Sequence, residues 1–106
     1  MAEPLTESYF YILLCLCERP MHGYGIMQNV EQLSHGRVRL AAGTLYGALN
    51  TMVSKGWIES LDAGASSRKK EYVITAEGRQ VARQELERLQ ELTRNGEAVI
   101  GGWQHG

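Results

Sequence analysis

A chain of 106 residues with 43% hydrophobic residues and a net charge of −1 has the composition of one small globular domain. Its longest apolar run, Tyr9 to Cys17, is too short for a membrane span, which needs roughly 20 residues, and residues 1–4 lack the basic start of a signal peptide. The spacing of Cys15 and Cys17 suits neither a redox C-x-x-C motif nor a zinc pair, so we expect buried thiols in a cytoplasmic protein without metal or cofactor.

The first predicted helix begins near Thr6 or Glu3 and ends ahead of Pro20, which removes a backbone donor and disfavours helical geometry at the preceding residue. It is apolar on all faces, and such a helix must be covered on every side. One small domain cannot easily do that, whereas a second subunit can. The residues of this helix assigned to a dimer interface are Tyr9, Phe10 and Leu14.

Residues 21–25 indicate a turn into a second helix, which ends at His35 and Gly36. His22 lies in that turn. Because no partner ligand stands at a metal-binding spacing from it, we interpret His22 as a turn or capping residue rather than a metal ligand or a catalytic group. Residues 37–40 form a short extended link to the next helix.

A third helix, predicted from Gly43 to Ser54, has two contrasting faces. Its inward face has apolar residues at positions i, i+3, i+4, i+7 and i+8, namely Leu45, Ala48, Leu49, Met52 and Val53. Its outward face is small or hydrogen-bonding and uncharged, which suits close approach to a DNA major groove. Lys55 and Gly56 end the helix. The residues of this helix assigned to DNA contact are Gly43, Thr44, Tyr46, Gly47 and Asn50.

Two short strands follow, over residues 57–61 and 68–74, joined by a Gly- and Ser-rich loop. The second strand begins with three cations, Arg68, Lys69 and Lys70. Residues 37–70 carry six cations against two acids, whereas residues 1–36 carry one cation against four acids. Because positive charge concentrates in this segment, we favour phosphate contact over a solvated charge run for the three cations.

The last predicted helix has Thr75 as its N-cap, runs from Ala76 towards Asn95 and is broken by Gly96. Its apolar stripe docks either on the first helix of the same chain or on a partner. We favour a dimer, because two elements carry surplus apolar surface and most soluble oligomers are twofold. The residues of this helix assigned to the dimer interface are Val81, Leu86, Leu89 and Leu92.

Helix, hairpin and helix in this order predict a mainly α (α+β) fold, a winged helix-turn-helix with a two-stranded wing and a C-terminal dimerisation helix. Residues 1–75 form the DNA-binding domain, and residues 76–106 form the dimerisation helix and a tail.

Four motifs occur in sequence along the chain. They are His22-Gly23-Tyr24-Gly25-Ile26, then Gly43-Thr44-Leu45-Tyr46 with Leu49, then Lys55-Gly56-Trp57-Ile58, then Arg68-Lys69-Lys70-x-Tyr72-x-Ile74-Thr75-x-x-Gly78. Over roughly residues 8–80 the chain resembles the PadR family of bacterial transcriptional regulators. The resemblance implies a winged helix-turn-helix repressor that dimerises through its C-terminal helix, assisted by the first helix. With room for one C-terminal helix, the chain is similar to the short subfamily, which includes multidrug-responsive repressors.

The resemblance also implies roles for individual residues. The recognition helix would start at Gly43–Thr44, where backbone amides and the threonine hydroxyl reach a phosphate. Tyr46 would bond a phosphate or reach a base edge, and Asn50 would pair with adenine. The cations at 68–70 would hold the wing to the DNA backbone or minor groove. Tyr72 is interpreted as a core residue with its hydroxyl at the surface.

The partners expected are double-stranded DNA with a pseudo-palindromic operator, a second copy of the chain, and a small hydrophobic effector between the first and last helices. The alternative for those helices is that their aromatic residues only close the dimer. A competing function is a winged-helix module for protein–protein interaction without DNA binding, which the local positive charge and the Tyr46 and Asn50 face disfavour. The sequence has no acid pair, phosphate loop or nucleophile–base pattern, so we expect no enzyme activity.

Overall fold

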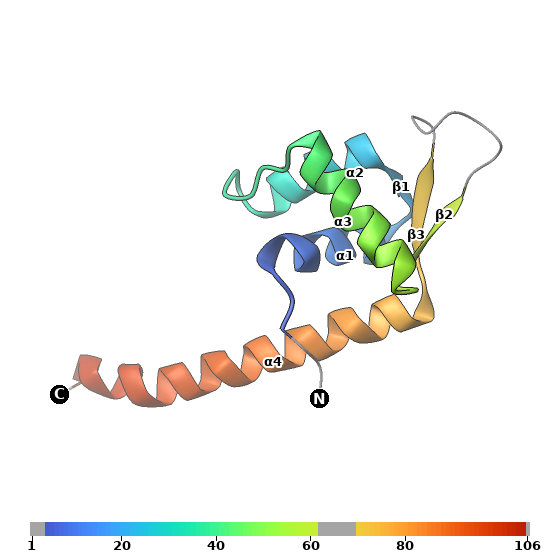
Figure 1. The fold of residues 1–106 in the computed structure, drawn as a ribbon. Coiled ribbons are helices and arrows are strands. Elements are labelled where there is room, and N and C mark those ends of the chain that lie inside the picture. Colours follow the sequence, from blue (N-terminus) through green and yellow to red (C-terminus); the bar gives the residue numbers. More distant parts are fainter. Residues whose placement is uncertain (1–3, 62–69, 106) are drawn as a thin grey trace.

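Three short helices and a small sheet sit on the first half of one long helix (Figure 1). The computed structural model describes residues 4–61 and 70–105, and its dimensions are 62 × 29 × 21 Å. We call the described part of residues 7–75 the head. The elements in chain order are α1 (Glu7–Glu18), β1 (Met21–His22), α2 (Gly23–Leu33), α3 (Ala42–Ser54), β2 (Ile58–Leu61), β3 (Glu71–Ile74), α4 (Ala76–Ile100) and the short 3-10 helix η2 (Gly101–His105).

The start of α1 follows one of the two predicted caps. The Thr6 hydroxyl accepts a hydrogen bond from the backbone N–H of Tyr9 at 3.2 Å, so Thr6 is the N-cap. The helix ends at Glu18, ahead of Pro20. Its fully buried residues are Ile12, Leu13, Cys15 and Leu16. The head therefore covers one face of α1, while the aromatic residues of its other faces stay partly exposed.

The sheet has one strand more than the predicted hairpin. β2 and β3 pair as expected, and β1 joins the other edge of β3, which gives the antiparallel order β1-β3-β2. Met21 lies opposite Tyr72, and His22 lies opposite Glu71. The prediction of a turn over residues 21–25 is therefore wrong at its start. A strand of two residues is too short to show an alternating pattern, and β1 exists because β3 lies beside it.

The hydrophobic core lies between α1, α2, α3 and the sheet. Four of the five residues predicted on the inner face of α3 are buried, but Val53 is 39% exposed. Val53 lies in the last turn, where the apolar stripe has rotated to the edge of the core. Tyr72 is buried at 3% exposure, as expected of a core residue, and burial raises the pKa of its hydroxyl.

A tight joint connects the end of α3 to the start of α4. The Thr75 hydroxyl donates to the carbonyl oxygens of Gly56 at 2.7 Å and Trp57 at 2.9 Å, and it accepts from the Gly78 N–H at 3.0 Å. Thr75 is thus the predicted N-cap of α4. A Cβ on Gly78 would lie 2.0 Å from the Trp57 carbonyl oxygen, so only glycine fits there. This contact sets the position of α4 against the head.

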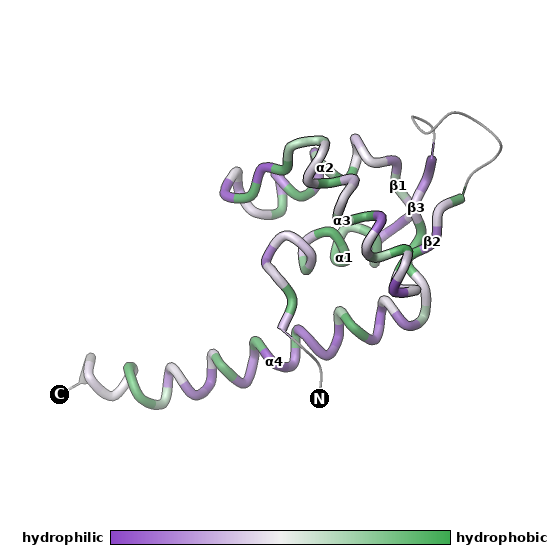
Figure 2. The backbone as a smooth tube through the Cα atoms, in the orientation of Figure 1, coloured by the Kyte–Doolittle hydropathy of each residue, from purple (hydrophilic) through white to green (hydrophobic). Residues whose placement is uncertain are grey.

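The long helix α4 continues further than predicted. It passes through Gly96 and ends at Ile100, so the prediction of a break at Gly96 is wrong. A glycine inside a helix costs only about 1 kcal/mol relative to alanine, which good helix formers on both sides can offset. Figure 2 shows hydrophobic and hydrophilic segments alternating along α4 as far as its C-terminal end. We call residues 90–100 the distal half of α4.

Both cysteines are free thiols, with Cys15 buried and Cys17 half-buried. Burial raises the pKa of the Cys15 thiol to about 11, which makes it unreactive at neutral pH. Within residues 4–61 and 70–105, no helix is long and apolar enough to cross a membrane. The same ranges contain no cluster of three or more His, Cys, Asp or Glu side chains able to hold a metal.

Candidate nucleic-acid interface

The outer face of α3 points to solvent. Leu45 and Leu49, both 0% exposed, anchor the helix in the core from the opposite side. This packing holds the helix in one orientation without using its outer face. The predicted DNA-contacting residues on that face are all exposed, namely Gly43, Thr44, Tyr46, Gly47 and Asn50.

Two of these residues are glycines that the fold does not require. A Cβ on Gly43 or Gly47 would meet no atom within 4 Å. Both lie inside a helix, where glycine costs roughly 0.5–1 kcal/mol relative to alanine. Since nothing inside the protein gains from them, their effect is to leave the outer face of α3 thin. A thin helix face lets a second surface approach the backbone closely.

The start of α3 has free hydrogen-bonding capacity. Its N-cap, Ala41, makes no side-chain cap bond, and the first turn contains no acidic residue. The backbone N–H groups of the first turn have no partner within the helix, and they form its electropositive end. The exposed Thr44 hydroxyl lies in the same turn. This end of α3 can bind an anion such as a phosphate.

Tyr46 is less available than the sequence suggested. A Cβ on Gly23 would lie 2.5 Å from the Tyr46 hydroxyl oxygen, so the tyrosine packs closely over the start of α2. It also lies near Tyr72, whose pKa it raises in addition to the larger effect of burial. Tyr46 is 37% exposed. Part of its ring therefore joins α3 to α2, which explains why motif residue Gly23 has no side chain.

The wing is tied to the start of α2 by His22. Its Nδ1 lies 3.2 Å from the backbone carbonyl oxygen of Lys70, the residue just before β3. His22 is the N-cap residue of α2 but makes no side-chain cap bond, so its predicted capping role is wrong. The contact joins residues 48 positions apart in the sequence, so local sequence patterns could not predict it. Lys70 is half-buried at the wing base, while Arg68 and Lys69 lie outside the described residues.

Two cations counted towards the positive segment are paired with acids. Arg37 forms an ion pair with Glu7, which raises the pKa of the guanidinium, and Arg39 lies 3.9 Å from Glu31. Both acids belong to the N-terminal stretch counted as negative. The charge separation in space is therefore smaller than the separation along the sequence. The count over residues 37–70 therefore overstates the net positive charge of this part of the molecule.

Tyr24 is a surface residue that the sequence analysis left without a role. It is 68% exposed in the first turn of α2, and its chain neighbour Gly23 packs against Tyr46. That turn contains no acidic residue. The motif from His22 to Ile26 was the one signal in the sequence that this segment has a role. Periodicity alone could not show that α2 begins beside α3 and the wing.

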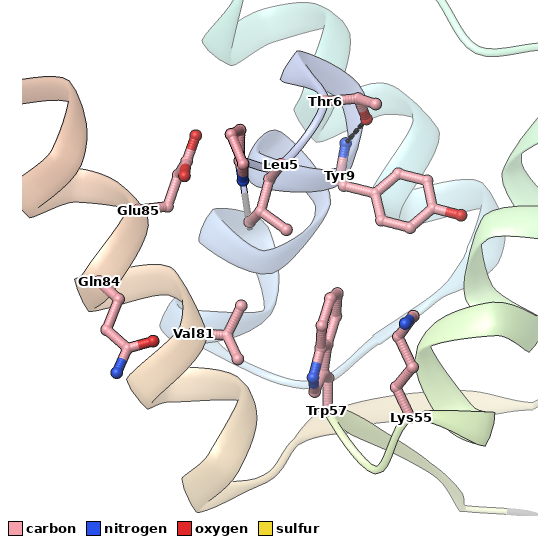
Figure 3. A pocket seen from close by; sticks show the side chains of 9 residues that line it. Leu5, Thr6, Tyr9, Lys55, Trp57, Val81, Gln84 and Glu85 are labelled. Atoms are coloured by element: carbon pink, nitrogen blue, oxygen red, sulfur yellow. Dashed lines mark hydrogen bonds between the residues drawn. The ribbon is translucent and has the colours of Figure 1, made fainter. Parts of the chain in front are cut away.

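The residues predicted at the dimer interface fall into two groups. Tyr9 and Val81 are half-buried against the core of their own head, where they line one cavity with Trp57 (Figure 3). Phe10, Leu14 and Leu89 are also half-buried, along a shallow groove between α1 and α4. Leu86 and Leu92 are 46% and 53% exposed. Apolar surface open to a partner is therefore left by the second group, which consists of Phe10, Leu14, Leu86, Leu89 and Leu92.

Glu85 of α4 is buried, although it is charged and lies outside the predicted apolar stripe of the last helix. Glu85 is 4% exposed, because α1 and the chain before it cover this side of α4. Its carboxylate accepts hydrogen bonds from Arg88 Nε at 2.9 Å and Nη2 at 2.6 Å. Arg88 lowers the pKa of Glu85, and the backbone N–H of Leu5 lowers it further. The ion pair with Arg88 compensates the buried charge of Glu85, a residue that helical spacing alone would place in solvent.

Comparison with known proteins agrees with this arrangement. A model of the transcriptional regulator PadR-like family matches residues 12–84. A curated relative, an uncharacterized 37.1 kDa protein in transposon TN4556 of Streptomyces fradiae, is 30% identical over 88 residues. That match covers 83% of this chain and 24% of the relative, so the chain spans about a quarter of that protein's length.

Two solved structures are similar over nearly their whole length. A transcriptional regulator from Clostridium thermocellum has a TM-score of 0.75 at 26% identity, covering 88% of this chain and 89% of that one. A PadR family transcription regulator from Clostridium difficile R20291 has a TM-score of 0.73 at 22% identity, covering 90% of this chain and 99% of that one. The second likeness shows that the fold is shared.

Proposed function

Because the chain belongs to the PadR-like family of transcriptional regulators, we propose that it is a homodimeric repressor that a small hydrophobic effector releases from its operator. Membership of a regulator family also agrees with the expectation that the chain is not an enzyme. The observation that carries the DNA-binding part is the outer face of α3, which is exposed, uncharged and thinned by two glycines that have no internal function.

The outer face of α3 enters the major groove in this proposal. Backbone amides of its first turn and the Thr44 hydroxyl bind a phosphate, and Asn50 contacts a base edge. The Tyr46 hydroxyl, which lies over Gly23 at the start of α2, contacts the DNA backbone there. The cations Arg68, Lys69 and Lys70 contact phosphates from the wing, whose base His22 holds against α2.

A substitution at Gly47 tests the DNA-binding face most directly. Gly47→Ala should leave the fold intact or stabilise it by up to about 1 kcal/mol, because alanine is the better helix former. Gly47→Leu should fold equally well, since the site is open. Both should weaken duplex binding, leucine more than alanine. Thermal unfolding and fluorescence anisotropy with a duplex selected from a random library would measure the two effects.

Salt dependence distinguishes DNA binding from the competing function of a protein–protein module. Binding should weaken steeply with salt, and Lys69→Ala or Lys70→Ala should reduce the salt slope by about one unit per lost phosphate contact. Glu59→Gln, on the exposed side of β2, is the matched control and should not reduce the slope. If no duplex bound with a salt-dependent affinity, the DNA-binding proposal would be wrong and the protein–protein module would be favoured.

The dimer proposal rests on the distal half of α4. This part of the helix extends beyond the head and carries exposed apolar residues, including Leu92, Val99 and Ile100. A stripe of apolar or small residues on α4 has alternating spacings of three and four residues, as in helices that pack side by side: Leu86, Leu89, Thr93, Gly96 and Ile100.

Gly96 repeats the feature seen on α3. A Cβ there would meet no atom within 4 Å, so the head does not require a glycine at this position. Within the stripe it allows a partner helix to approach closely. We place the α4 helix of a second copy on this stripe, with the remaining exposed aromatic side of α1 completing the interface.

A further inference from the structure

Two consecutive residues at the start of α2 contact both of the elements that carry the proposed DNA contacts. His22 ends β1, the strand that pairs with β3 of the wing, and Gly23 begins α2. Gly23 is the residue over which Tyr46 of α3 packs, with room for no side chain beneath the tyrosine hydroxyl. Figure 1 shows β1 beside β3 at the point where α2 begins. The wing and the recognition helix are therefore joined through one short segment.

The contact of this segment with the wing ends in a side chain. The β1–β3 ladder has two residue pairs, Met21 with Tyr72 and His22 with Glu71. The next pair in this register would join residue 23 to residue 70, but the chain is already helical at residue 23 and turns away from β3. In place of that pair, the His22 side chain reaches the carbonyl oxygen of Lys70. It extends the contact by one residue towards the wing loop.

The chemistry of this hydrogen bond specifies the state of the imidazole. The two atoms are 3.2 Å apart, and a carbonyl oxygen can only accept. His22 Nδ1 therefore carries the hydrogen and donates it. The ring is exposed, so no other packing explains why it lies against the backbone of Lys70. Its effect is to fix the backbone of Lys70 at the base of the wing.

A fixed backbone matters for the lysine that it carries. Lys70 is half-buried, so part of its side chain already has a restricted range. A lysine side chain loses conformational freedom when its ammonium binds a phosphate, and this cost is smaller when the backbone is held in advance. The same segment seats Tyr46 through Gly23. The position of Lys70 relative to the outer face of α3 is thus set by His22 and Gly23.

We propose that His22 is a positioning residue for DNA binding, which holds Lys70 where its ammonium reaches a phosphate while the outer face of α3 lies in the major groove. The inference rests on the proposed function, which places Lys70 on the DNA backbone. His22 itself contributes no contact to the duplex. It acts through the Lys70 carbonyl, and its removal costs affinity because Lys70 must then be ordered on binding.

The geometry of the donor gives a test with closely matched variants. Nδ1 is bonded directly to Cγ, as is the amide nitrogen of asparagine, whereas the amide nitrogen of glutamine lies one bond further out. His22→Asn should therefore keep duplex affinity within about twofold of the parent. His22→Ala and His22→Gln should lower it by about two- to tenfold, the range that one hydrogen bond supplies. Fluorescence anisotropy with the selected duplex would measure these affinities, and thermal unfolding would show that all variants fold.

An exposed glutamine at the far end of α2 provides a control for this series. Gln32→Ala changes the same helix ten residues from His22 and should bind the duplex as the parent does. An equal loss of affinity in His22→Asn and His22→Ala would overturn the proposal, because the donated hydrogen bond would then not be the cause. Unchanged affinity in His22→Ala would overturn it as well.

A double-mutant cycle shows whether His22 acts through Lys70. Lys70→Ala should weaken duplex binding and lower the salt slope by about one unit. In that background, His22→Ala should cause less than a twofold further loss, since the side chain that it positions is absent. A merely structural role, or a direct contact of His22 with DNA, predicts the same loss in both backgrounds. That result would overturn the proposal.

The hydrogen bond can also be examined without DNA. At a pH where imidazoles are neutral, long-range proton–nitrogen spectra should show the hydrogen of His22 on Nδ1, whereas imidazoles in water carry it mainly on Nε2. The His22→Asn variant assigns the signals. A hydrogen on Nε2 of His22 would overturn the positioning role and leave the repressor proposal intact. Failure to bind any duplex, with the hydrogen on Nδ1, would instead overturn the repressor proposal and with it any role of this contact in DNA binding.

Discussion

The outer face of α3 and the distal half of α4 are both helix surfaces that the head leaves uncovered, yet they differ in chemistry. The α3 face is small, polar and uncharged, whereas distal α4 carries exposed leucine, valine and isoleucine side chains. Each also contains glycine where added atoms would meet nothing, at Gly43 and Gly47 on α3 and at Gly96 on α4. In the proposed function, these glycines allow another molecule to approach both surfaces closely.

The difference in chemistry indicates different partners. Exposing apolar side chains to water is unfavourable, and covering them with another apolar surface lowers the free energy. Such a surface suits a permanent protein partner. A small polar face is well solvated by water and does not need to be covered. Such a surface suits a ligand that binds and dissociates. The joint at Thr75 and Gly78 connects the two surfaces, so changes at one can reach the other.

The largest expected effect comes from breaking that joint. Gly78→Ala places a Cβ 2.0 Å from the Trp57 carbonyl oxygen, against backbone that cannot move freely. We expect the free energy of unfolding to fall by about 3 kcal/mol or more, at the upper end of overpacking costs. Chemical denaturation would measure it. Gly47→Ala, which adds a Cβ in open space, is the control and should not destabilise the protein. A similar loss in both variants would show that the close contact at Gly78 has no special cost.

The next effect sharpens the role of the apolar surface. Leu92→Glu places a charge on the distal half of α4, where it must be desolvated in a dimer but not in a monomer. In a twofold dimer, both copies carry the new charge, so the desolvation cost arises twice. At micromolar concentration, sedimentation should show the parent at about twice 11.8 kDa and the variant mainly as monomer. Glu91→Gln, which removes a neighbouring charge but changes no apolar residue, should remain dimeric. A monomeric parent would refute the assignment of this surface.

The polar surface should respond to a smaller change. Asn50 is exposed and leaves the core unaffected, so Asn50→Ala should fold normally. If its amide contacts a base, affinity for the selected duplex should fall by about 1–3 kcal/mol while affinity for unrelated duplex stays almost constant. Tyr46→Phe should instead weaken binding to both, because a hydroxyl on phosphate carries no sequence information. Competition titrations would compare the variants, and an unchanged Asn50→Ala would remove Asn50 from the reading face.

The smallest expected effect concerns the covered half of α4. Arg88 holds the pKa of Glu85 below its usual range, with a further contribution from the Leu5 N–H. Because the pKa is lower in the folded protein, the stabilisation is present above the ordinary glutamate pKa of about 4.3 and is lost as pH falls through the folded value. Glu85→Gln should therefore show a smaller loss of thermal stability between neutral and acidic pH. An identical pH dependence in variant and parent would contradict this role.

Many features of the fold were predictable because their causes are local. Thr6 and Thr75 cap the helices that follow them, and the apolar spacing of α3 identified its buried face apart from Val53. The outer face of α3 followed from the same spacing, since residues opposite a buried stripe must point outward. The motifs shared with the PadR family identified the family, which composition could not do.

The features missed depend on residues far apart in the chain. β1 forms only because β3 lies beside it, and His22 binds the Lys70 carbonyl instead of capping its own helix. Glu85 is buried because the N-terminal segment crosses α4 at that point, and the Arg37 and Arg39 charges are reduced by acids from the opposite half of the sequence.

The sequence by itself determined which helices form and which face of each is apolar. These properties follow from side-chain periodicity and capping, which act within a few residues. Tertiary structure alone decided that Trp57, Lys55 and Val81 meet around one cavity and that Gly78 must admit the Trp57 carbonyl. Such contacts depend on how whole elements are placed against one another, and no local pattern in the chain encodes that placement.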